Sequence, residues 1–278
     1  MKLIKFDNVN LYYQRVESYL LQDEAVNCLL LASCLSLRNS DRHQSSYLVS
    51  IEEDRAILAT AIQIGDRQLL LSKSSNLDAV QLIAEDFAVN VESVPGIAAP
   101  QSEAEMFVTA WRNLTKQSIK LEVFMSIQQL KEIKAIASAA GKLRLARAQE
   151  TELLTDWIQA FVKEALAKNE SKANSRQWVN RHLETNSLYV WEDIDRVVSM
   201  AACSGKTPNG IRVNSVYTPY EYRGKGYATA CVAAMSKILL EQQQYCFLFA
   251  DPANPTSNKI YDRIGYMLID KIANYEFY

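Results

Sequence analysis

Histidine is scarce in this sequence. His43 and His182 are the only two in 278 residues, and they lie far apart in the chain. Two separated imidazoles give no metal cluster, and they leave no serine–histidine–aspartate arrangement to argue for. The sequence therefore predicts no bound metal, and each histidine is expected at the surface or at a helix cap.

A surplus of one sign of charge is missing as well. Lysine and arginine number 30, and aspartate and glutamate 32, so there is no electrostatic reason to expect nucleic acid or an anionic membrane as a partner. No apolar run reaches the roughly 18 residues of a membrane span. Residues 1–7 lack the apolar core of a signal peptide. These absences predict a cytoplasmic protein.

Paired cysteines are also missing. The five cysteines are odd in number, and no two of them have a C-x-x-C spacing. This pattern predicts buried thiols in a reducing compartment rather than disulfides or metal ligands. The residues are Cys28, Cys34, Cys203, Cys231 and Cys246.

The length of the chain suits two domains of ordinary size. The apolar pattern weakens over residues 128–141, and residues 138–141 are small. We therefore predict an α/β domain over residues 1–135 and a second one over residues 142–278.

Alternating and helical patterns predict the elements of both halves. The first half is expected to hold a long first helix capped by Asn8 or Asn10, then strands 47–51, 56–62 and 68–72, helix 77–89, extended segment 94–99, helix 102–114 capped by Ser102, and strand 119–127. The second half is expected to hold strand 142–147, helices near 151–166 and 176–183, hairpin strands 187–191 and 196–202, strand 211–217, helix 228–242, strand 245–250, helix 255–264 and a last strand.

The most informative stretch is a strand, a glycine-rich turn and a helix start. Residues 211–217 alternate as a strand, Pro219 ends the ladder, and Arg223-Gly224-Lys225-Gly226 leads into an apolar helical pattern. The first N–H groups of a helix have no internal partner, and the helix dipole adds partial positive charge there. The turn is therefore predicted to bind phosphate.

Two familiar nucleotide loops do not fit this turn. A Walker loop needs lysine and then serine or threonine after its last glycine, but Gly226 is followed by Tyr227. A dinucleotide-binding loop needs a third glycine or alanine where this chain has Thr229. A dinucleotide-binding enzyme is therefore set aside.

The second half resembles the GNAT superfamily of N-acetyltransferases. That family's loop pattern, Gln/Arg-x-x-Gly-x-Gly/Ala, runs here from Glu221 to Gly226, with Glu221 at the first position. Residues 247–251, 254–261 and 264–266 match its fifth strand, fourth helix and following turn. The resemblance extends from about residue 142 to the C terminus. It implies a mixed, mostly antiparallel sheet flanked by helices.

The resemblance further implies acetyl-CoA as co-substrate. The residues placed near it are Val216, Tyr217, Thr218, Arg223, Gly224, Lys225, Gly226, Tyr227, Ala228, Asn254, Ser257 and Asn258. A backbone N–H near Val216 or Tyr217 would stabilise an oxyanion. Asn254, followed by proline, is also expected to cap a helix without any ligand.

Tyr261 is the one side chain to which the resemblance assigns a catalytic role. It would protonate the departing thiolate, since a phenol is neutral at pH 7. Its alternative role is that of a core residue. Trp157 and Trp178 are expected in the core or along the acceptor groove. The general base is left open among Glu221, Glu192, Asp251 and water.

The function implied is transfer of an acetyl group from acetyl-CoA to an amine, on a small molecule or a peptide, by direct attack in a ternary complex. The alternative is a non-catalytic acyl-CoA-binding or interaction protein. The acceptor and the oligomeric state are not readable from the sequence.

The first half is expected to be a degenerate copy of the same GNAT-like fold. From its three strands onward, the order of elements agrees with that of the second half. At the place of the phosphate loop, however, residues 73–78 contain no glycine, and Asn76 is expected to cap a helix. We therefore expect no CoA bound by the first half.

Overall fold

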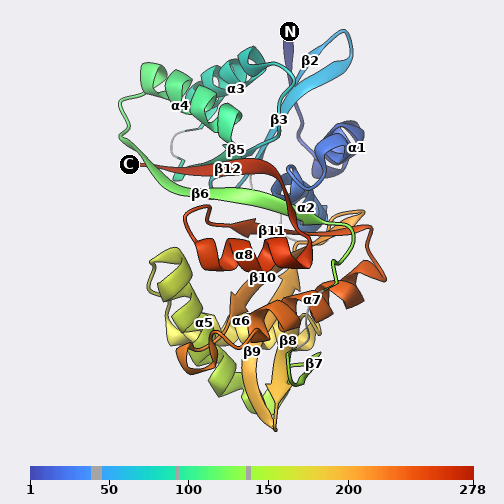
Figure 1. The fold of residues 1–278 in the computed structure, drawn as a ribbon. Coiled ribbons are helices and arrows are strands. Elements are labelled where there is room, and N and C mark those ends of the chain that lie inside the picture. Colours follow the sequence, from blue (N-terminus) through green and yellow to red (C-terminus); the bar gives the residue numbers. More distant parts are fainter. Residues whose placement is uncertain (39–45, 92–93, 136–138) are drawn as a thin grey trace. The chain divides into compact units, whose positions relative to one another are not determined.

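The computed structural model describes residues 1–38, 46–91, 94–135 and 139–278 (Figure 1). The chain divides into two compact units. The N-terminal unit comprises Met1–Ile127, Ala250–Pro252 and Leu268–Tyr278, and the C-terminal unit comprises Gln128–Phe249 and Ala253–Met267. These units differ from the predicted ranges 1–135 and 142–278, because the last strand of the chain pairs inside the N-terminal unit.

The N-terminal unit contains both helices and strands. In chain order its elements are β1 (Lys2–Lys5), α1 (Val9–Leu20), the 3-10 turn η1 (Leu21–Asp23), α2 (Cys28–Arg38), β2 (Ser46–Glu53), β3 (Ala56–Ile64), β4 (Leu69–Leu71), α3 (Leu77–Asn90), β5 (Gly96–Pro100), α4 (Gln101–Leu114), β6 (Ile119–Leu130) and, from the far end of the chain, β12 (Met267–Phe277).

The sheet of the N-terminal unit is mixed. Its spatial order is β1-β2-β3-β4-β5-β12-β6. β4 and β5 are parallel, whereas β12 runs antiparallel to β5 with Ala273 opposite Ala99. The C-terminal strand thus covers the β5 edge, which would otherwise present unpaired backbone groups.

Apolar side chains fill both faces of this sheet. One core lies under α3 and α4 and contains Phe87, Phe107 and Trp111, with Phe277 of β12 stacked on the last two. The other core lies under α1 and α2 and contains Tyr12, Val16 and Leu31.

Two predictions in this half are wrong in detail. The long first helix is two helices, because Asn27 turns the chain between them: its amide donates to the carbonyl oxygen of Leu20, and its side-chain oxygen accepts from the backbone of Lys73. Ser102 does not cap α4. That helix begins at Gln101, and the Ser102 hydroxyl donates to Glu103 instead.

The C-terminal unit has the same kinds of elements. They are β7 (Lys142–Leu145), the 3-10 turn η2 (Ala148–Glu150), α5 (Thr151–Leu166), α6 (Lys172–Glu184), β8 (Leu188–Asp193), β9 (Arg196–Ser204), β10 (Gly210–Tyr217), the 3-10 turn η3 (Tyr220–Tyr222), α7 (Tyr227–Leu240), β11 (Tyr245–Ala250) and α8 (Pro255–Ile264). The sheet order within this unit is β11-β10-β9-β8-β7.

Two layers of helices cover the sheet of the C-terminal unit. α5 and α6 pack on one face through a cluster that includes Leu154, Val179 and Met200. α7 packs on β8, β9 and β10 from the other face, with Cys231 beside Ser199. The loop between β10 and α7 therefore joins the sheet to the helix that covers this second face.

The two units repeat one order of elements. Each runs strand, two helices, three strands joined antiparallel, helix, a strand parallel to the third, and helix. The parallel pair is β4 with β5 in the first unit and β10 with β11 in the second. The predicted α/β architecture with a repeated fold is confirmed.

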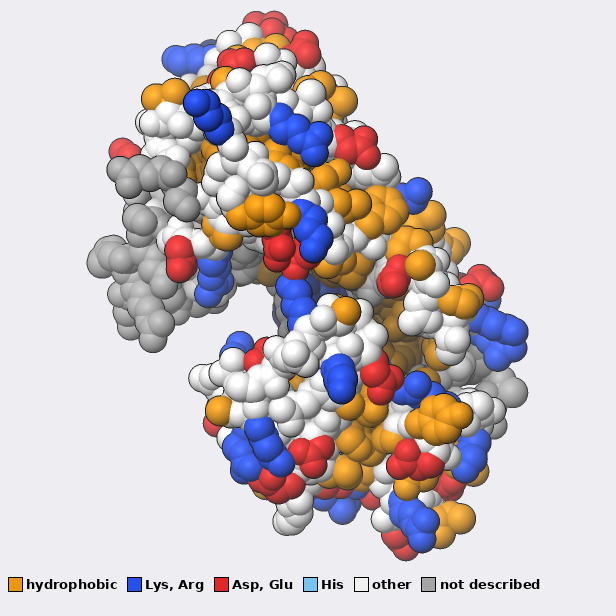
Figure 2. Space-filling view, turned by 90° about the vertical axis from the view of Figure 1, so that its left-hand side faces the viewer, with side chains coloured by type: hydrophobic (Ala, Val, Ile, Leu, Met, Phe, Trp, Pro, Cys, Tyr) orange, Lys and Arg blue, Asp and Glu red, His pale blue; other side chains and the backbone are white. Residues whose placement is uncertain are grey.

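Charge and cysteine patterns agree with the sequence. Acidic and basic side chains are interspersed on the face shown in Figure 2. All five cysteines lie in the described part of the chain, and each is a buried free thiol, as predicted. No helix among the described residues has the length and apolarity to cross a membrane.

Candidate functional site

The turn between β10 and α7 holds two glycines in the left-handed backbone region. Gly224 has φ +78° and Gly226 has φ +81°. A side chain at Gly224 would meet no atom within 4 Å, and one at Gly226 would meet only Ala139 at 3.8 Å. The glycines are therefore needed for backbone conformation, and the space above them is open.

The backbone amides of this turn are uncommitted. The first bond of α7 is donated by Ala230 to the carbonyl of Gly226, at 3.0 Å, and the cap residue Gly226 offers no side chain. Among the described residues, no acceptor binds the amides of residues 224–229. Successive free donors at the positive end of a helix are the arrangement that binds phosphate in proteins generally.

Side chains on either side of the turn fix its position. Arg223 donates to Glu164 of α5 at 2.5 Å and to the carbonyl oxygen of Thr218 at 2.9 Å. Tyr227, at the start of α7, donates to Asp193 at 2.5 Å. The Arg223 guanidinium is therefore engaged with protein groups, and the free donors of the turn are mainly backbone.

The remaining predicted side chains of this loop play smaller parts. Thr218 shares a hydrogen bond with Ser199 at 2.8 Å, whereas the Lys225 ammonium lies 5.9 Å from the ring centre of Tyr222. Ala228 is half-buried in the first turn of α7.

A β-bulge interrupts β10 just before the loop. Asn214 pairs with Ala202 and Tyr217 pairs with Met200, so one extra residue is inserted between them. Ser215, inside the bulge, has φ +50°. The bulge breaks the ladder at Ser215 and Val216. The oxyanion-binding amide was predicted at Val216 or Tyr217, at the end of this bulge.

β10 and β11 share only a short ladder. Their parallel pairing covers Gly210 to Arg212 on β10 and Tyr245 to Phe247 on β11. Both strands continue beyond this ladder. The pairing between them thus ends upstream of the bulge.

Asn254 caps α8 as predicted. Its side-chain oxygen accepts from the backbone of Ser257 at 3.1 Å, and its backbone carbonyl accepts from the side chain of Asn258 at 2.8 Å. Pro255 occupies the first turn. This capping network is complete without a ligand.

Tyr261 lies on the buried side of α8. Its side chain is 9% exposed, and its ring makes an edge contact with Tyr266 at 5.8 Å. Burial raises the pKa of Tyr261 to about 12. The phenol is therefore protonated at neutral pH and can act as a donor.

Among the carboxylates considered as a general base, Glu192 is neutralised by basic neighbours. Arg144 donates to it at 2.6 Å, and Lys142 lies 3.5 Å away. The hydrogen bond from Arg144 lowers the pKa of Glu192. A carboxylate held in this way is a poor proton acceptor. Glu221 and Asp251 are exposed.

His182 is not a surface or capping residue. It is 7% exposed, packs on Trp178 with ring centres 3.9 Å apart, and its Nδ1 lies 2.6 Å from the Ser187 hydroxyl. Burial, together with the charges of Arg181 and Arg212, lowers the pKa of His182 to about 4. His43 lies outside the described residues.

The two tryptophans differ in their surroundings. Trp157 is 8% exposed and lies 6.0 Å from the ring of Tyr217 on β10, whereas Trp178 is half-buried against His182. Trp157 therefore belongs to the α5 core at the end of the strand that carries the bulge.

The corresponding loop of the N-terminal unit is closed by its own side chains. The amide of Ser74 donates to Glu103 at 2.8 Å, and the amide of Lys73 donates to Asn27 at 2.9 Å. Glu103 is 2% exposed, and Asn76 caps α3 as predicted. A protein carboxylate thus occupies a donor that a phosphate would need.

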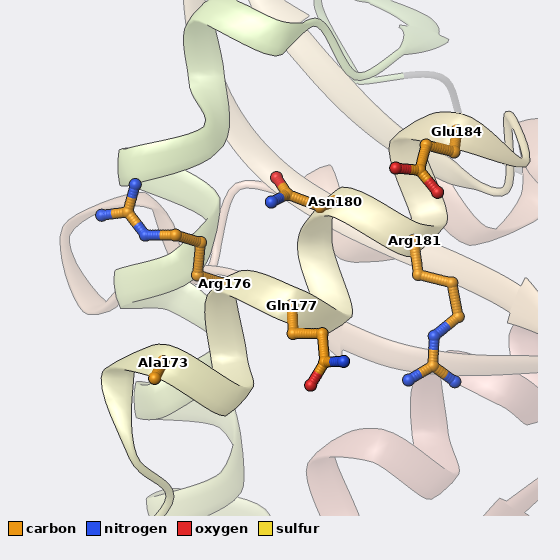
Figure 3. A pocket seen from close by; sticks show the side chains of 6 residues that line it. All are labelled: Ala173, Arg176, Gln177, Asn180, Arg181 and Glu184. Atoms are coloured by element: carbon orange, nitrogen blue, oxygen red, sulfur yellow. The ribbon is translucent and has the colours of Figure 1, made fainter.

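A shallow hollow on the C-terminal unit lies elsewhere. Figure 3 shows that its lining side chains all project from α6. They are exposed residues of that single helix: Ala173, Arg176, Gln177, Asn180, Arg181 and Glu184. We regard it as an ordinary helix surface, because one helix alone cannot enclose a ligand.

The described loop lies inside a region matched by a known family. The model of FR47-like proteins matches residues 195–275, which include β9, the loop and Tyr261. No curated protein sequence matches the chain.

Solved structures extend the likeness to the whole chain. A GNAT-family acetyltransferase from Colwellia psychrerythraea has a TM-score of 0.56 at 12% identity, with 100% of both chains covered. A Drosophila protein has a TM-score of 0.66 at 12% identity, covering 99% of this chain and 98% of its own. A tandem GNAT protein from the clavulanic acid biosynthesis pathway has a TM-score of 0.57 at 9% identity, covering 99% of this chain and 97% of its own. The GNAT resemblance is confirmed for the fold.

Three features of this part of the structure went unrecognised in the sequence. Glu164, which holds Arg223, looks like any surface glutamate of a helix. The bulge at Ser215 interrupts a regular alternating pattern without a glycine to mark it. Arg212 did carry a signal, since it is a charged residue between Ile211 and Val213 in the middle of a strand.

Proposed function

We propose that this chain is an acetyl-CoA-dependent N-acetyltransferase. The observation that carries the proposal is the row of six uncommitted amides, from Gly224 to Thr229, at the start of α7. The GNAT fold, and the FR47-like match that spans this loop, support acyl transfer as the general activity. The pyrophosphate of the co-substrate would accept from these amides, and the pantetheine arm would pass Asn254, Ser257 and Asn258.

The reaction needs few side chains. A neutral amine nitrogen attacks the thioester carbonyl carbon, the carbon–sulfur bond breaks, and the proton of the amine passes to solvent. An amide at the β10 bulge, at Val216 or Tyr217, would donate to the carbonyl oxygen as it gains charge. Holding both reactants in one ternary complex supplies most of the rate advantage.

Tyr261 would donate a hydrogen bond to the leaving sulfur. Its pKa is raised to about 12, whereas a thiol of the cysteine type has a pKa of about 8.5. Complete proton transfer from this phenol to the thiolate would therefore be uphill. Donation without transfer still stabilises the charge that develops on sulfur, and the thiolate then takes its proton from water.

We further propose that the N-terminal unit is a non-catalytic copy of the fold. Its order of elements repeats that of the C-terminal unit, but Glu103 and Asn27 hold the amides of its loop. The whole chain would thus bind one acetyl-CoA. An amine on a small molecule or a peptide would be the acceptor, in the cytoplasm.

Incubation with acetyl-CoA and a panel of amines tests the proposal. Release of free thiol should depend on the amine, and the Gly226→Val variant should release far less. Tight binding of acetyl-CoA without amine-dependent thiol release would instead identify an acyl-CoA-binding protein.

A further inference from the structure

Arg212, the third residue of β10, donates few hydrogen bonds to the residues that the structure describes. A guanidinium has five N–H donors. One of them, on Nη2, reaches the Ser204 hydroxyl at 3.3 Å. The Nε is buried and has no partner among the described residues. Ser204 cannot take a further bond easily, because it also accepts from Asn214 at 2.7 Å.

Other arginines of the same unit contrast with Arg212. Arg144 pairs with Glu150 and Glu192, and Arg223 pairs with Glu164. Arg212 instead lies over the ring of Phe249 at 5.6 Å. It is a half-buried cation with an apolar neighbour, and no carboxylate of the described chain balances its charge. A buried donor without a protein partner is costly, and in folded proteins such a donor is completed by ordered water, an ion or a ligand.

The strand register shows which face of the sheet Arg212 occupies. Arg212 is opposite Ser204, Asn214 is opposite Ala202, and Tyr217 is opposite Met200. Ala202 and Met200 belong to the core beneath α5 and α6. Directly opposed residues point to the same side of a sheet. Arg212 therefore projects toward the α5 and α6 side.

The surroundings of His182 support this placement independently. His182 is on α6, and Arg212 is one of the cations that lower its pKa. The guanidinium also lies where the ladder of β10 and β11 ends, at Arg212 and Phe247. It is therefore upstream of the bulge, on the strand that would hold the reacting carbonyl.

We propose that Arg212 binds an anionic group of the acceptor, so that the acceptor is a small amine bearing a carboxylate or a phosphate. This inference rests on the proposed acetyl transfer, because it assigns the acceptor of that reaction. Two parallel N–H groups of a guanidinium match either oxyanion. Arg212 is a specificity-determining residue and takes no part in breaking the carbon–sulfur bond.

Matched pairs of amines test the proposal by initial rates of thiol release. Glycine and alanine are compared with glycinamide and alaninamide, and O-phosphoethanolamine with ethanolamine. In the wild type, kcat/KM for the anionic member should exceed that of its neutral partner by about tenfold or more, as a charged hydrogen bond allows. A larger kcat/KM ratio for the amino acid pairs identifies a carboxylate as the anion, and a larger ratio for the phosphoethanolamine pair identifies a phosphate.

The variants separate recognition from a structural role. Arg212→Met keeps a long unbranched side chain without the charge, and it should raise KM for the anionic amine while leaving KM for the neutral partner nearly unchanged. Arg212→Lys should restore part of the preference and gives a second variant if the first folds poorly. Arg181→Met, which removes an exposed arginine of α6, should keep the wild-type ratio. A ratio near one in the wild type, or an equal ratio in Arg212→Met, overturns the proposal.

A binding measurement covers the case in which no amine is acetylated. The CoA-saturated protein is titrated with N-acetylglycine and with N-acetylglycinamide. Tighter binding of N-acetylglycine than of N-acetylglycinamide, lost in Arg212→Met, supports the anion site. If no amine is acetylated, the same result counts against the proposed acetyl transfer. Absence of any Arg212-dependent preference, in turnover and in titration alike, overturns the inference.

Discussion

Replacing Gly226 by valine should weaken CoA binding far more than it weakens the fold. The residue has φ +81°, and a side chain in the left-handed region costs about 1–2 kcal/mol. The nearest atom to an added Cβ is 3.8 Å away, so crowding adds little. The backbone would relieve this strain by turning, which moves the amides of residues 225–227.

The loss of affinity follows from the bonds that such a turn breaks. A hydrogen bond to a charged group contributes about 1.5–3 kcal/mol, and each 1.4 kcal/mol corresponds to about tenfold in affinity. Loss of one amide–phosphate bond should therefore raise the Kd for CoA by roughly 10- to 150-fold. Calorimetric titration with CoA measures this directly.

Gly65→Val is the matched control. Gly65 also has a positive φ, +58°, and a side chain there would meet nothing within 4 Å. Its backbone strain is similar, but it lies in the turn between β3 and β4, away from the proposed loop. Both variants should lose comparable stability in urea, and only Gly226→Val should lose CoA affinity. Equal CoA affinities in the two variants would refute the loop assignment.

Three further predictions concern Tyr261, His182 and the loop of the N-terminal unit. Tyr261→Phe should lower kcat about 10- to 100-fold with little change in KM for acetyl-CoA, because the bond to sulfur forms mainly in the transition state; unchanged turnover would make Tyr261 a packing residue. The pKa of His182 is lowered from 6.5 to about 4, so its contribution to stability is present above pH 6.5 and is lost as pH falls toward 4. The free energy of unfolding from urea titrations should fall between pH 7 and pH 5 by at most about 2 kcal/mol from this cause, and His182→Gln should remove that part of the fall; an equal fall in both proteins would contradict it. Wild-type protein should bind one CoA per chain, because Glu103 holds the loop amide of Ser74; a second site that survives Gly226→Val would argue against a closed N-terminal loop.

The sequence predicted the elements that depend on local pattern. The strand–loop–helix around Gly224 and Gly226, the cap at Asn254 and the repeated order of elements all follow from spacing and turn residues over short stretches. Such features are determined largely by residues that are close together in the sequence, and the structure confirms them.

Features that depend on distant partners were not predictable in the same way. β12 pairs with β5, with Ile272 opposite Pro100, and such a distant pairing cannot be read from composition, so the division into units was not predictable. Asn27 divides the first helix because it binds Lys73 of a later loop. His182 is buried by packing on Trp178 and by contact with Ser187, which no local pattern specifies.

The site was predictable in its backbone and less so in its side chains. Glycine and proline mark the loop, but the partners of Arg223 and Glu192 are set by tertiary contacts with Glu164 and Arg144. Glu192, one of the candidates for the general base, is thereby neutralised by Arg144. Arg223, which was predicted to contact the cofactor, is already paired with Glu164.

The most direct test of acetyl transfer is to follow both products of one reaction. With acetyl-CoA labelled in its acetyl carbons and an amine that supports thiol release, mass spectrometry should find the label on the amine nitrogen, in a one-to-one ratio with free CoA. The Gly226→Val variant should lower both products together. Free CoA accompanied only by labelled acetate, or acetyl-CoA that stays intact while bound, would contradict the proposed function.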